Sequence, residues 1–240
     1  MPVVVEDKCL GCKLCIPVCP VDAFKPVTKR LVQIDQDSCV ECYICLRKEA
    51  CPHGAIVPTE LDTLRNFAHF LSDPTETKVS TGVPGRGTEE SKTNDVTGRT
   101  KKGEVGIAID MGRPGVGLRL VDAEKVAMAV AKAGLVFEEC SPLTEIMEDK
   151  TTGKLKEEYL QAHLLSIIVE GTIPTGGFGK IIEALREVEG QIDTVFSLGV
   201  ITRVDENGYS PVLEEMDKVG LPRPVRGKVN AGLGKPLCND

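Results

Sequence analysis

The sequence predicts an α+β protein in which a cysteine-rich N-terminal module precedes a βαββαβ sandwich. The first observation behind this prediction is that eight of the ten cysteines fall in two similar runs before residue 52. The second is that, from residue 104 on, apolar residues recur with the periods of strand, helix, strand, strand, helix and strand. The chain has 240 residues, of which 41% are hydrophobic, so it can fold into two globular units.

The two cysteine runs share a triplet with two-residue gaps and a later Cys-Pro pair. The first run consists of Cys9, Cys12, Cys15 and Cys19-Pro20, and the second of Cys39, Cys42, Cys45 and Cys51-Pro52. The triplet repeats after thirty residues and the Cys-Pro pair after thirty-two, so the second run carries a two-residue insertion within residues 46–50. A triplet with these gaps allows a short loop to wrap three corners of a cubane, and the fourth corner needs a more distant cysteine.

This arrangement resembles the bacterial 2[4Fe–4S] ferredoxin family over about residues 1–60. The resemblance implies two [4Fe–4S] clusters, in which the fourth cysteine of each run ligates the other cluster. The first cluster would then be held by Cys9, Cys12, Cys15 and Cys51, and the second by Cys39, Cys42, Cys45 and Cys19. Zinc in two four-cysteine sites is the alternative, although the doubled triplet is far more specific than a lone CxxC. The longer loop of residues 46–50 departs from the family pattern, and short strands are expected at residues 3–5, 31–35 and 55–57.

Composition argues against several other classes of protein. The formal net charge is −7, no long Lys/Arg run is present and Trp is absent, so a nucleic-acid partner is not expected. No segment approaches the roughly 18 apolar residues of a membrane span. The N-terminus lacks the basic region and long apolar core of a secretion signal, so a cytoplasmic location is expected. In a reducing compartment, closely spaced cysteines indicate metal ligation rather than disulfides.

Residues 61–103 are predicted to join the two units. A helix is expected over residues 61–71, with Leu61, Leu64, Ala68 and Leu71 on one face, packed against the cysteine-rich module. The stretch that follows is rich in Gly, Thr and charge, most densely in residues 85–99. Its composition is typical of a solvated linker, and the other hypothesis is a loop that docks on a partner or ligand.

Residues 104–208 are predicted to form the sandwich. Strands are expected over residues 104–110, 135–139, 164–169 and 192–204, the third ending just before Gly171. The first helix is expected to have Asp122 as N-cap and Gly134 after its end, and the second carries the stripe Phe178, Ile181, Ile182 and Leu185. This order is that of the ferredoxin-like sandwich, and it resembles ligand-binding domains of the ACT type.

Several isolated residues leave two interpretations open. Gly112, Gly115 and Gly117 between the first strand and helix predict a tight turn, or an anion site with Arg113 and Arg119. Cys140 is expected to be a buried packing residue rather than a ligand, and His53 an exposed residue rather than one that tunes a cluster. His69 and His163 lack partners at ligand spacing. Residues 209–240, which include Cys238, are expected to form an extended arm.

A second resemblance covers the chain up to about residue 210. The chain resembles the ferredoxin-containing part of 6-hydroxynicotinate reductase in three short runs. These are Gly85-Arg86-Gly87-Thr88-Glu89-Glu90, then Thr93-Asn94-Asp95-Val96-Thr97-Gly98-Arg99, and later Gly112-Arg113-Pro114-Gly115. That family uses reduced ferredoxin to reduce a heteroaromatic ring, and it has a further C-terminal domain without a counterpart in these residues.

The two resemblances together imply an iron–sulfur subunit without catalytic residues of its own. Such a subunit would pass low-potential electrons from a donor to a catalytic reductase subunit, in which a flavin is expected. Two other hypotheses stay open. The chain could be a redox-responsive regulatory protein whose sandwich binds a metabolite, or a free-standing electron carrier.

Overall fold

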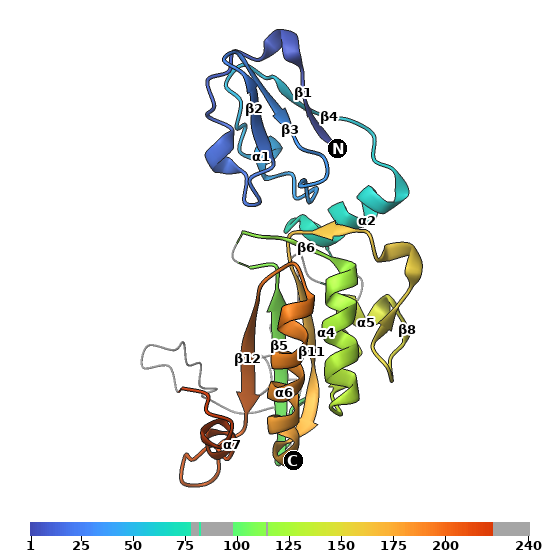
Figure 1. Ribbon diagram of the computed structural model, residues 1–240, viewed down its shortest axis with the longest axis vertical. Coiled ribbons are helices and arrows are strands. Elements are labelled where there is room, and N and C mark those ends of the chain that lie inside the picture. Colours follow the sequence, from blue (N-terminus) through green and yellow to red (C-terminus); the bar gives the residue numbers. More distant parts are fainter. Residues whose placement is uncertain (78–81, 83–97, 114, 223–240) are drawn as a thin grey trace.

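The computed structural model describes residues 1–77, 82, 98–113 and 115–222. Figure 1 shows an elongated molecule with the cysteine-rich module at one end and a larger body of helices and strands at the other. Helix α2 (Thr63–Ser72) lies between them. The mixture of helices and strands agrees with the predicted α+β class.

Two antiparallel strand pairs frame the cysteine-rich module. Strand β1 (Pro2–Val4) pairs with β4 (Ile56–Pro58), and β2 (Phe24–Thr28) pairs with β3 (Leu31–Ile34). The sequence predicted three of these strands to within a residue or two at each end and missed β2, whose residues after Phe24 are exposed. A short helix, α1 (Ile44–Arg47), follows the second cysteine triplet. The core of the module is small and contains Phe24, Val32, Cys45 and Ala50.

Helix α2 connects the module to the larger body through both of its faces. It begins after Asp62, whose carboxylate accepts a hydrogen bond from the Arg65 backbone N–H at 2.8 Å, so Leu61 lies outside the helix. Ala68 and Leu71 are buried in the core of the larger body. An adjacent side of the helix carries Arg65 and His69, which bond to the second cysteine loop.

A four-stranded antiparallel sheet forms the larger body. Its strands are β5 (Glu104–Met111), β7 (Val136–Phe137), β11 (Ile167–Pro174) and β12 (Phe196–Thr202), in the spatial order β12-β5-β11-β7. Figure 1 shows helices α4 (Leu120–Lys132) and α6 (Phe178–Val188) side by side on one face of this sheet. Val105, Ile107 and Ile109 alternate toward that face and are at most 1% exposed. Along the chain, the four strands and two helices follow in the order β5, α4, β7, β11, α6, β12.

Two boundaries differ from the sequence prediction for identifiable reasons. Helix α4 begins at Leu120, so Asp122 lies in its first turn and is not the N-cap. There its carboxylate binds Lys125 at 2.9 Å, and a negative charge in the first turn suits the helix dipole. Strand β11 continues through Gly171, because this glycine allows close approach of β7. A Cβ atom on Gly171 would lie 2.1 Å from the carbonyl oxygen of Val136.

Further short elements lie between and after these strands. Strand β6 (Leu118–Arg119) pairs with β10 (His163–Leu164), helix α5 (Pro142–Glu145) follows β7, and β8 (Met147–Asp149) pairs with β9 (Lys154–Leu155). The prediction of an extended arm from residue 209 is wrong over α7 (Val212–Lys218), which is helical. The remainder of that arm from residue 223, with Cys238, lies outside the described residues, as do residues 85–97 of the polar loop.

The described helices include none that is both long enough and apolar enough to cross a lipid bilayer.

Candidate functional site

The two cysteine loops have the same backbone conformation. Gly11 and Lys13, which separate the cysteines of the first triplet, have φ angles of 67° and 64°. Thirty residues later, Glu41 and Tyr43 have φ angles of 53° and 55°. A left-handed conformation costs a residue with a side chain about 1 kcal/mol, so three non-glycine residues hold this shape at an energetic cost. The sequence repeat is therefore also a repeat in three dimensions.

The later cysteine of each run also has the same surroundings in both halves. The Sγ of Cys19 accepts a hydrogen bond from the Ala23 N–H at 3.3 Å, and the Sγ of Cys51 accepts one from Ala55 at 3.4 Å. A hydrogen bond donated to sulfur favours the thiolate over the thiol. Each of these two cysteines thus has a backbone donor suited to a ligating thiolate.

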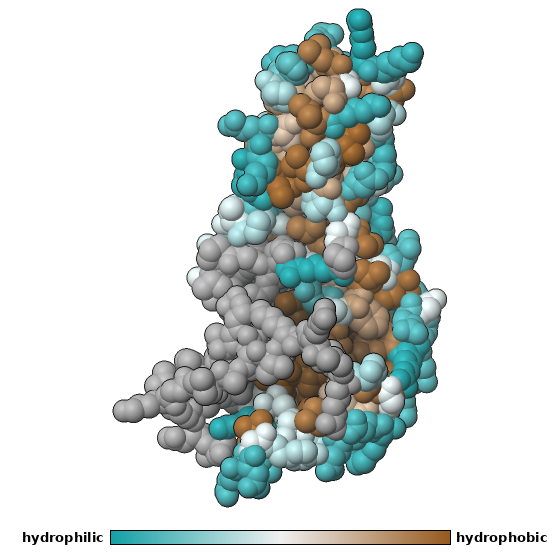
Figure 2. Space-filling model, turned by 90° about the vertical axis from the view of Figure 1, so that its left-hand side faces the viewer, coloured by the Kyte–Doolittle hydropathy of each residue, from teal (hydrophilic) through white to brown (hydrophobic). Residues whose placement is uncertain are grey.

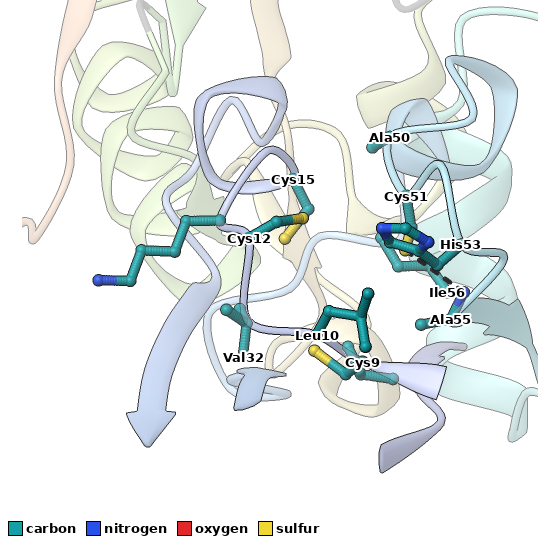
Figure 3. A pocket seen from close by; sticks show the side chains of 12 residues that line it. Cys9, Leu10, Cys12, Cys15, Val32, Ala50, Cys51, His53, Ala55 and Ile56 are labelled. Atoms are coloured by element: carbon teal, nitrogen blue, oxygen red, sulfur yellow. Dashed lines mark hydrogen bonds between the residues drawn. The ribbon is translucent and has the colours of Figure 1, made fainter. Parts of the chain in front are cut away.

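The first cysteine triplet shares a pocket with a cysteine from the second run. Cys9, Cys12, Cys15 and Cys51 all line this pocket, and Figure 3 shows the triplet facing Cys51 across it. Burial raises the pKa of Cys15, and the nearby thiols of Cys12, Cys51 and Cys9 raise that pKa further. Cys51 therefore lies across a pocket from the first triplet, and it also lines a second pocket together with Cys45 of its own run.

The second triplet is more deeply buried than the first. Cys42 and Cys45 are 7% and 8% exposed, whereas Cys12 is exposed to solvent. Burial raises the pKa of Cys39 to about 12 and that of Cys45 to about 11. Cys19 is among the charged neighbours that raise the pKa values of Cys42 and Cys45. The later cysteine of the first run thus lies beside the second triplet.

These donors fit a cluster of several iron atoms. Four cysteines from two separate runs line the first pocket. Closely spaced thiolates repel one another, so a cationic centre favours the loss of their protons, and a [4Fe–4S] cluster takes four thiolates at four separate corners.

Charged side chains hold the second cysteine loop in place. The Glu41 side chain is 1% exposed and pairs with Arg65 at 2.7 Å, while its backbone carbonyl accepts a hydrogen bond from His69 Nδ1 at 2.8 Å. The Arg47 guanidinium donates to the carbonyl of Cys42 at 2.8 Å and forms an ion pair with Asp73. Sequence reasoning missed this network. The one available signal was the acidic Glu41 at the position that Gly11 occupies in the first loop.

The larger body contacts the module through the glycine-rich loop at residues 112–117. A Cβ atom on Gly115 would lie 2.7 Å from the carbonyl oxygen of Pro20, directly after Cys19. His163 Nδ1 also donates to the carbonyl of Asp37 at 2.9 Å. The chain reverses between the described residues on either side of position 114, since the N–H groups of Val116 and Gly117 both bond to the carbonyl of Gly112, at 3.2 and 3.0 Å. The function of this loop in the fold is to join the two units.

The arginines considered for an anion site already have protein partners. Arg113 lies 3.2 Å from a carboxylate oxygen of Asp110, and Arg119 donates to the carbonyl of Gln161. His53 is exposed, as predicted, and lines the first pocket. Cys140 is exposed, so the prediction that it is a buried packing residue is wrong.

Comparison with known families finds a match at the N-terminus of the chain. The family described as 4Fe-4S binding domain matches residues 2–25. The N-terminal module is a ferredoxin-type iron–sulfur domain. The chain is 43% identical over 60 residues to a ferredoxin of Rickettsia felis, covering 24% of this chain and 52% of that protein. It is 41% identical over 64 residues to ferredoxin-1 of Caulobacter vibrioides, covering 26% and 54%.

A third relative of the ferredoxin-type domain belongs to a larger assembly. It is a subunit of the ion-translocating oxidoreductase complex of Methanosarcina acetivorans, 43% identical over 53 residues, which cover 22% of this chain and 19% of that protein. The chain spans about half the length of the two ferredoxins and a smaller share of this third relative. No solved structure matches the chain.

Proposed function

We propose that this chain is the iron–sulfur electron-transfer subunit of a ferredoxin-dependent reductase complex. It carries two [4Fe–4S] clusters and relays low-potential electrons to an active site in a partner subunit. The first cluster is held by Cys9, Cys12, Cys15 and Cys51, and the second by Cys39, Cys42, Cys45 and Cys19. When bound, such clusters supply one-electron redox chemistry, at a potential set by hydrogen bonds to sulfur, local charge and solvent access.

The observation that carries this proposal is the exchange of the later cysteines between the two triplets. Cys51 lines the pocket of the first triplet, and Cys19 is a charged neighbour of Cys42 and Cys45 in the second. The repeated backbone and the matching N–H donors at Ala23 and Ala55 support the same ligand function in both halves. A single cluster would need only one of these two sets.

The surroundings of the two sets support a relay between two different partners. Cys12 is exposed at the first set, where a soluble protein has access to it. At the second set, Cys42 and Cys45 are shielded from water, and the Arg65 and Arg47 guanidinium groups fix the loop around them. Burial disfavours the extra negative charge of a reduced cluster, and Arg65 and Arg47 are each neutralised by a carboxylate, Glu41 or Asp73. The more buried second cluster would therefore have the lower reduction potential of the two.

The partner subunit is proposed from the resemblances. The likeness to the ferredoxin-containing part of 6-hydroxynicotinate reductase, and a relative that is itself part of a complex, both support a separate catalytic chain. A flavin in that chain would convert single electrons into a two-electron reduction. Residues 104–208, proposed to be a ferredoxin-like sandwich, would be the platform that binds it, with residues 61–103 as connector and residues 209–240 as a docking arm.

A redox-responsive regulatory protein is the second candidate. One observation favours it, namely that Gly115 in the larger body contacts Pro20 beside Cys19. A metabolite bound to an ACT-like domain at residues 104–208 would then act directly on the second cluster. This candidate differs from the first in needing no catalytic partner.

One purification decides between these functions. The chain is isolated anaerobically from its native host, analysed for iron and labile sulfide, and examined by native mass spectrometry. About eight iron atoms and eight sulfides per chain, with a stoichiometric flavin-containing subunit, are expected. Stoichiometric zinc would overturn the electron-transfer proposal. A lone, fully loaded chain whose reduction potential shifts with a small ligand would support the regulatory function instead.

A further inference from the structure

The surface around the first cysteine loop combines exposed apolar and cationic side chains. We define the distal surface by Leu10, Cys12, Lys13, Leu14, Lys29 and Arg30. Leu10 and Leu14 are 60% and 57% exposed, and Cys12 between them is exposed as well. Leu10, Cys12 and Lys13 line the first pocket, so the apolar surface leads directly to the proposed first cluster.

Two cations of the β2–β3 hairpin lie beside this loop. A Cβ atom on Gly11 would lie 2.5 Å from both the Arg30 Cα and the carbonyl oxygen of Lys29, so the hairpin turn packs on the loop backbone. Lys13, Lys29 and Arg30 are exposed and have no ion-pair partner among the residues that the structure describes. The loop that exposes Leu10 and Leu14 therefore also carries Lys13 and packs against the turn that carries Lys29 and Arg30.

The charge of this region is opposite to that of the chain. Residues 8–30 contain the five cations Lys8, Lys13, Lys25, Lys29 and Arg30 and one acid, Asp22, which pairs with Lys25 at 3.1 Å. Glu6 and Asp7 precede Lys8, and Glu6 accepts a hydrogen bond from Gln33. The whole chain nevertheless has a formal net charge of −7. A local cationic surface on an acidic protein orients a charged partner toward one end of the molecule.

The opposite side of the module is already occupied by the chain itself. The described hydrogen bonds and ion pairs between residues 1–60 and the rest of the chain come from residues 36–47, through partners such as Arg65, His69 and His163. The distal surface has none of these contacts. Figure 2 shows hydrophobic surface mixed with hydrophilic groups on the module, at the narrow end of the molecule.

We propose that the distal surface is the docking site for a redox protein that presents acidic groups around its own cofactor. This inference rests on the proposed electron-transfer function. It adds where on the chain the partner binds and which charge the partner's surface carries. Leu10 and Leu14 exclude water at the centre of the contact, and Lys13, Lys29 and Arg30 attract the acidic rim. Electrostatic complementarity of this kind acts mainly on the rate of association and on the choice of partner.

The test uses two protein oxidants of opposite charge. The iron-loaded chain is reduced anaerobically and mixed in a stopped-flow instrument with an acidic flavodoxin or with basic cytochrome c, over a series of salt concentrations. The rate with flavodoxin is expected to be highest at low salt and to fall as salt screens the charges. Lys29→Glu combined with Arg30→Glu is expected to lower that rate about tenfold at low salt.

The matched control changes the same number of charges elsewhere. Lys132→Glu combined with Lys180→Glu, both exposed on the larger body, is expected to leave the flavodoxin rate within about twofold of the wild type. Equal effects of the two double variants would overturn the docking site, as would a flavodoxin rate that does not fall with rising salt while the cytochrome c rate does. Self-association of the holo chain that is lost in the Lys29/Arg30 variant would assign the surface to a second copy and overturn the redox-partner proposal. A chain without iron would overturn the proposed function itself, whereas an iron-loaded chain without charge preference overturns only the docking site.

Discussion

The Arg65 guanidinium lies 2.7 Å from a carboxylate oxygen of Glu41, and it comes from a helix outside the cysteine-rich module. Glu41 separates Cys39 from Cys42, so helix α2 reaches into the loop proposed to hold the second cluster. The first loop has Gly11 at the equivalent position, and that glycine packs on the β2–β3 turn instead. The two cysteine loops share one backbone conformation, but an ion pair with helix α2 holds the second loop, whereas packing on the β2–β3 turn holds the first.

Arg65→Ala is expected to destabilise the protein by about 3 kcal/mol, because it leaves the buried Glu41 carboxylate without its cation. Urea denaturation of the iron-loaded protein, followed by circular dichroism, measures the loss. Glu41→Gln in the Arg65→Ala background should restore most of the stability, since it removes the unpaired charge. A double variant as unstable as Arg65→Ala alone would show that packing, and not the buried charge, is the cause.

Cys19→Ala and Cys51→Ala are expected to remove different clusters, each about four iron atoms per chain. Alkylation of the anaerobic protein, read by mass spectrometry, identifies the cysteines that lose protection. Cys19→Ala should expose Cys39, Cys42 and Cys45 to the reagent, and Cys51→Ala should expose the first triplet. The reverse pattern would disprove the exchange of cysteines between the two runs.

Gly115→Ala is expected to loosen the contact between the larger body and the module. Its Cβ would lie 2.7 Å from the carbonyl oxygen of Pro20, at a φ of 61°. Gly208→Ala is the matched control, because Gly208 has a φ of 75° and nothing within 4 Å of the added atom. Both variants carry about 1 kcal/mol of backbone strain. Only Gly115→Ala should speed hydrogen–deuterium exchange in peptides that contain Pro20 and Asp37, and equal exchange in both variants would count against the contact.

His163 is expected to make stability depend on pH. Burial lowers its pKa below the ordinary value of 6.5, and the nearby Arg119 lowers it further against the opposing effect of the Asp37 carbonyl. Below pH 6.5 the unfolded chain therefore binds more protons at this residue than the folded chain does. Stability is complete above that pH and is lost as the pH falls through the lower, folded pKa.

Urea denaturation of the wild type and His163→Gln at pH 7.5 and pH 5.5 measures this dependence. The wild type should lose more stability than the variant on acidification, because glutamine keeps a donor for Asp37 but does not titrate. An identical loss in both proteins would show that His163 does not titrate in this window.

Sequence reasoning was most successful where a local pattern determines a local structure. Alternation in residues 104–110 predicted β5 to within one residue, because one face of that strand is buried and the period of a strand is two. The boundaries at Asp122 and Gly171 were wrong because both residues contact distant parts of the chain: Asp122, besides pairing with Lys125, accepts a hydrogen bond from the Asp193 N–H at 3.3 Å. The third strand was predicted to end just before Gly171, yet this glycine lies inside β11, where its lack of a side chain lets β7 approach.

In the candidate site too, local sequence patterns predicted some features, and features that depend on distant residues were missed. The spacing of the cysteines predicted two groups, since short gaps in the sequence fix which thiols can converge. The contacts of Arg65, His69 and His163 with the second loop join residues far apart in the chain, and no periodic pattern encodes them. Charge counts over residues 8–30 were available from the sequence, but their position beside Cys12 depends on the packing of the hairpin turn on Gly11.

The position of Cys51 in the pocket of the first triplet has a consequence for the order of synthesis. A chain leaving the ribosome already contains Cys19 when the second triplet emerges, so the second set of four is complete at residue 45. The first set, although its triplet is made first, waits for residue 51. The earlier half of the repeat is thus the later one to be finished. A nascent chain that stops between these two residues has all four ligands proposed for the second cluster and only three of those proposed for the first.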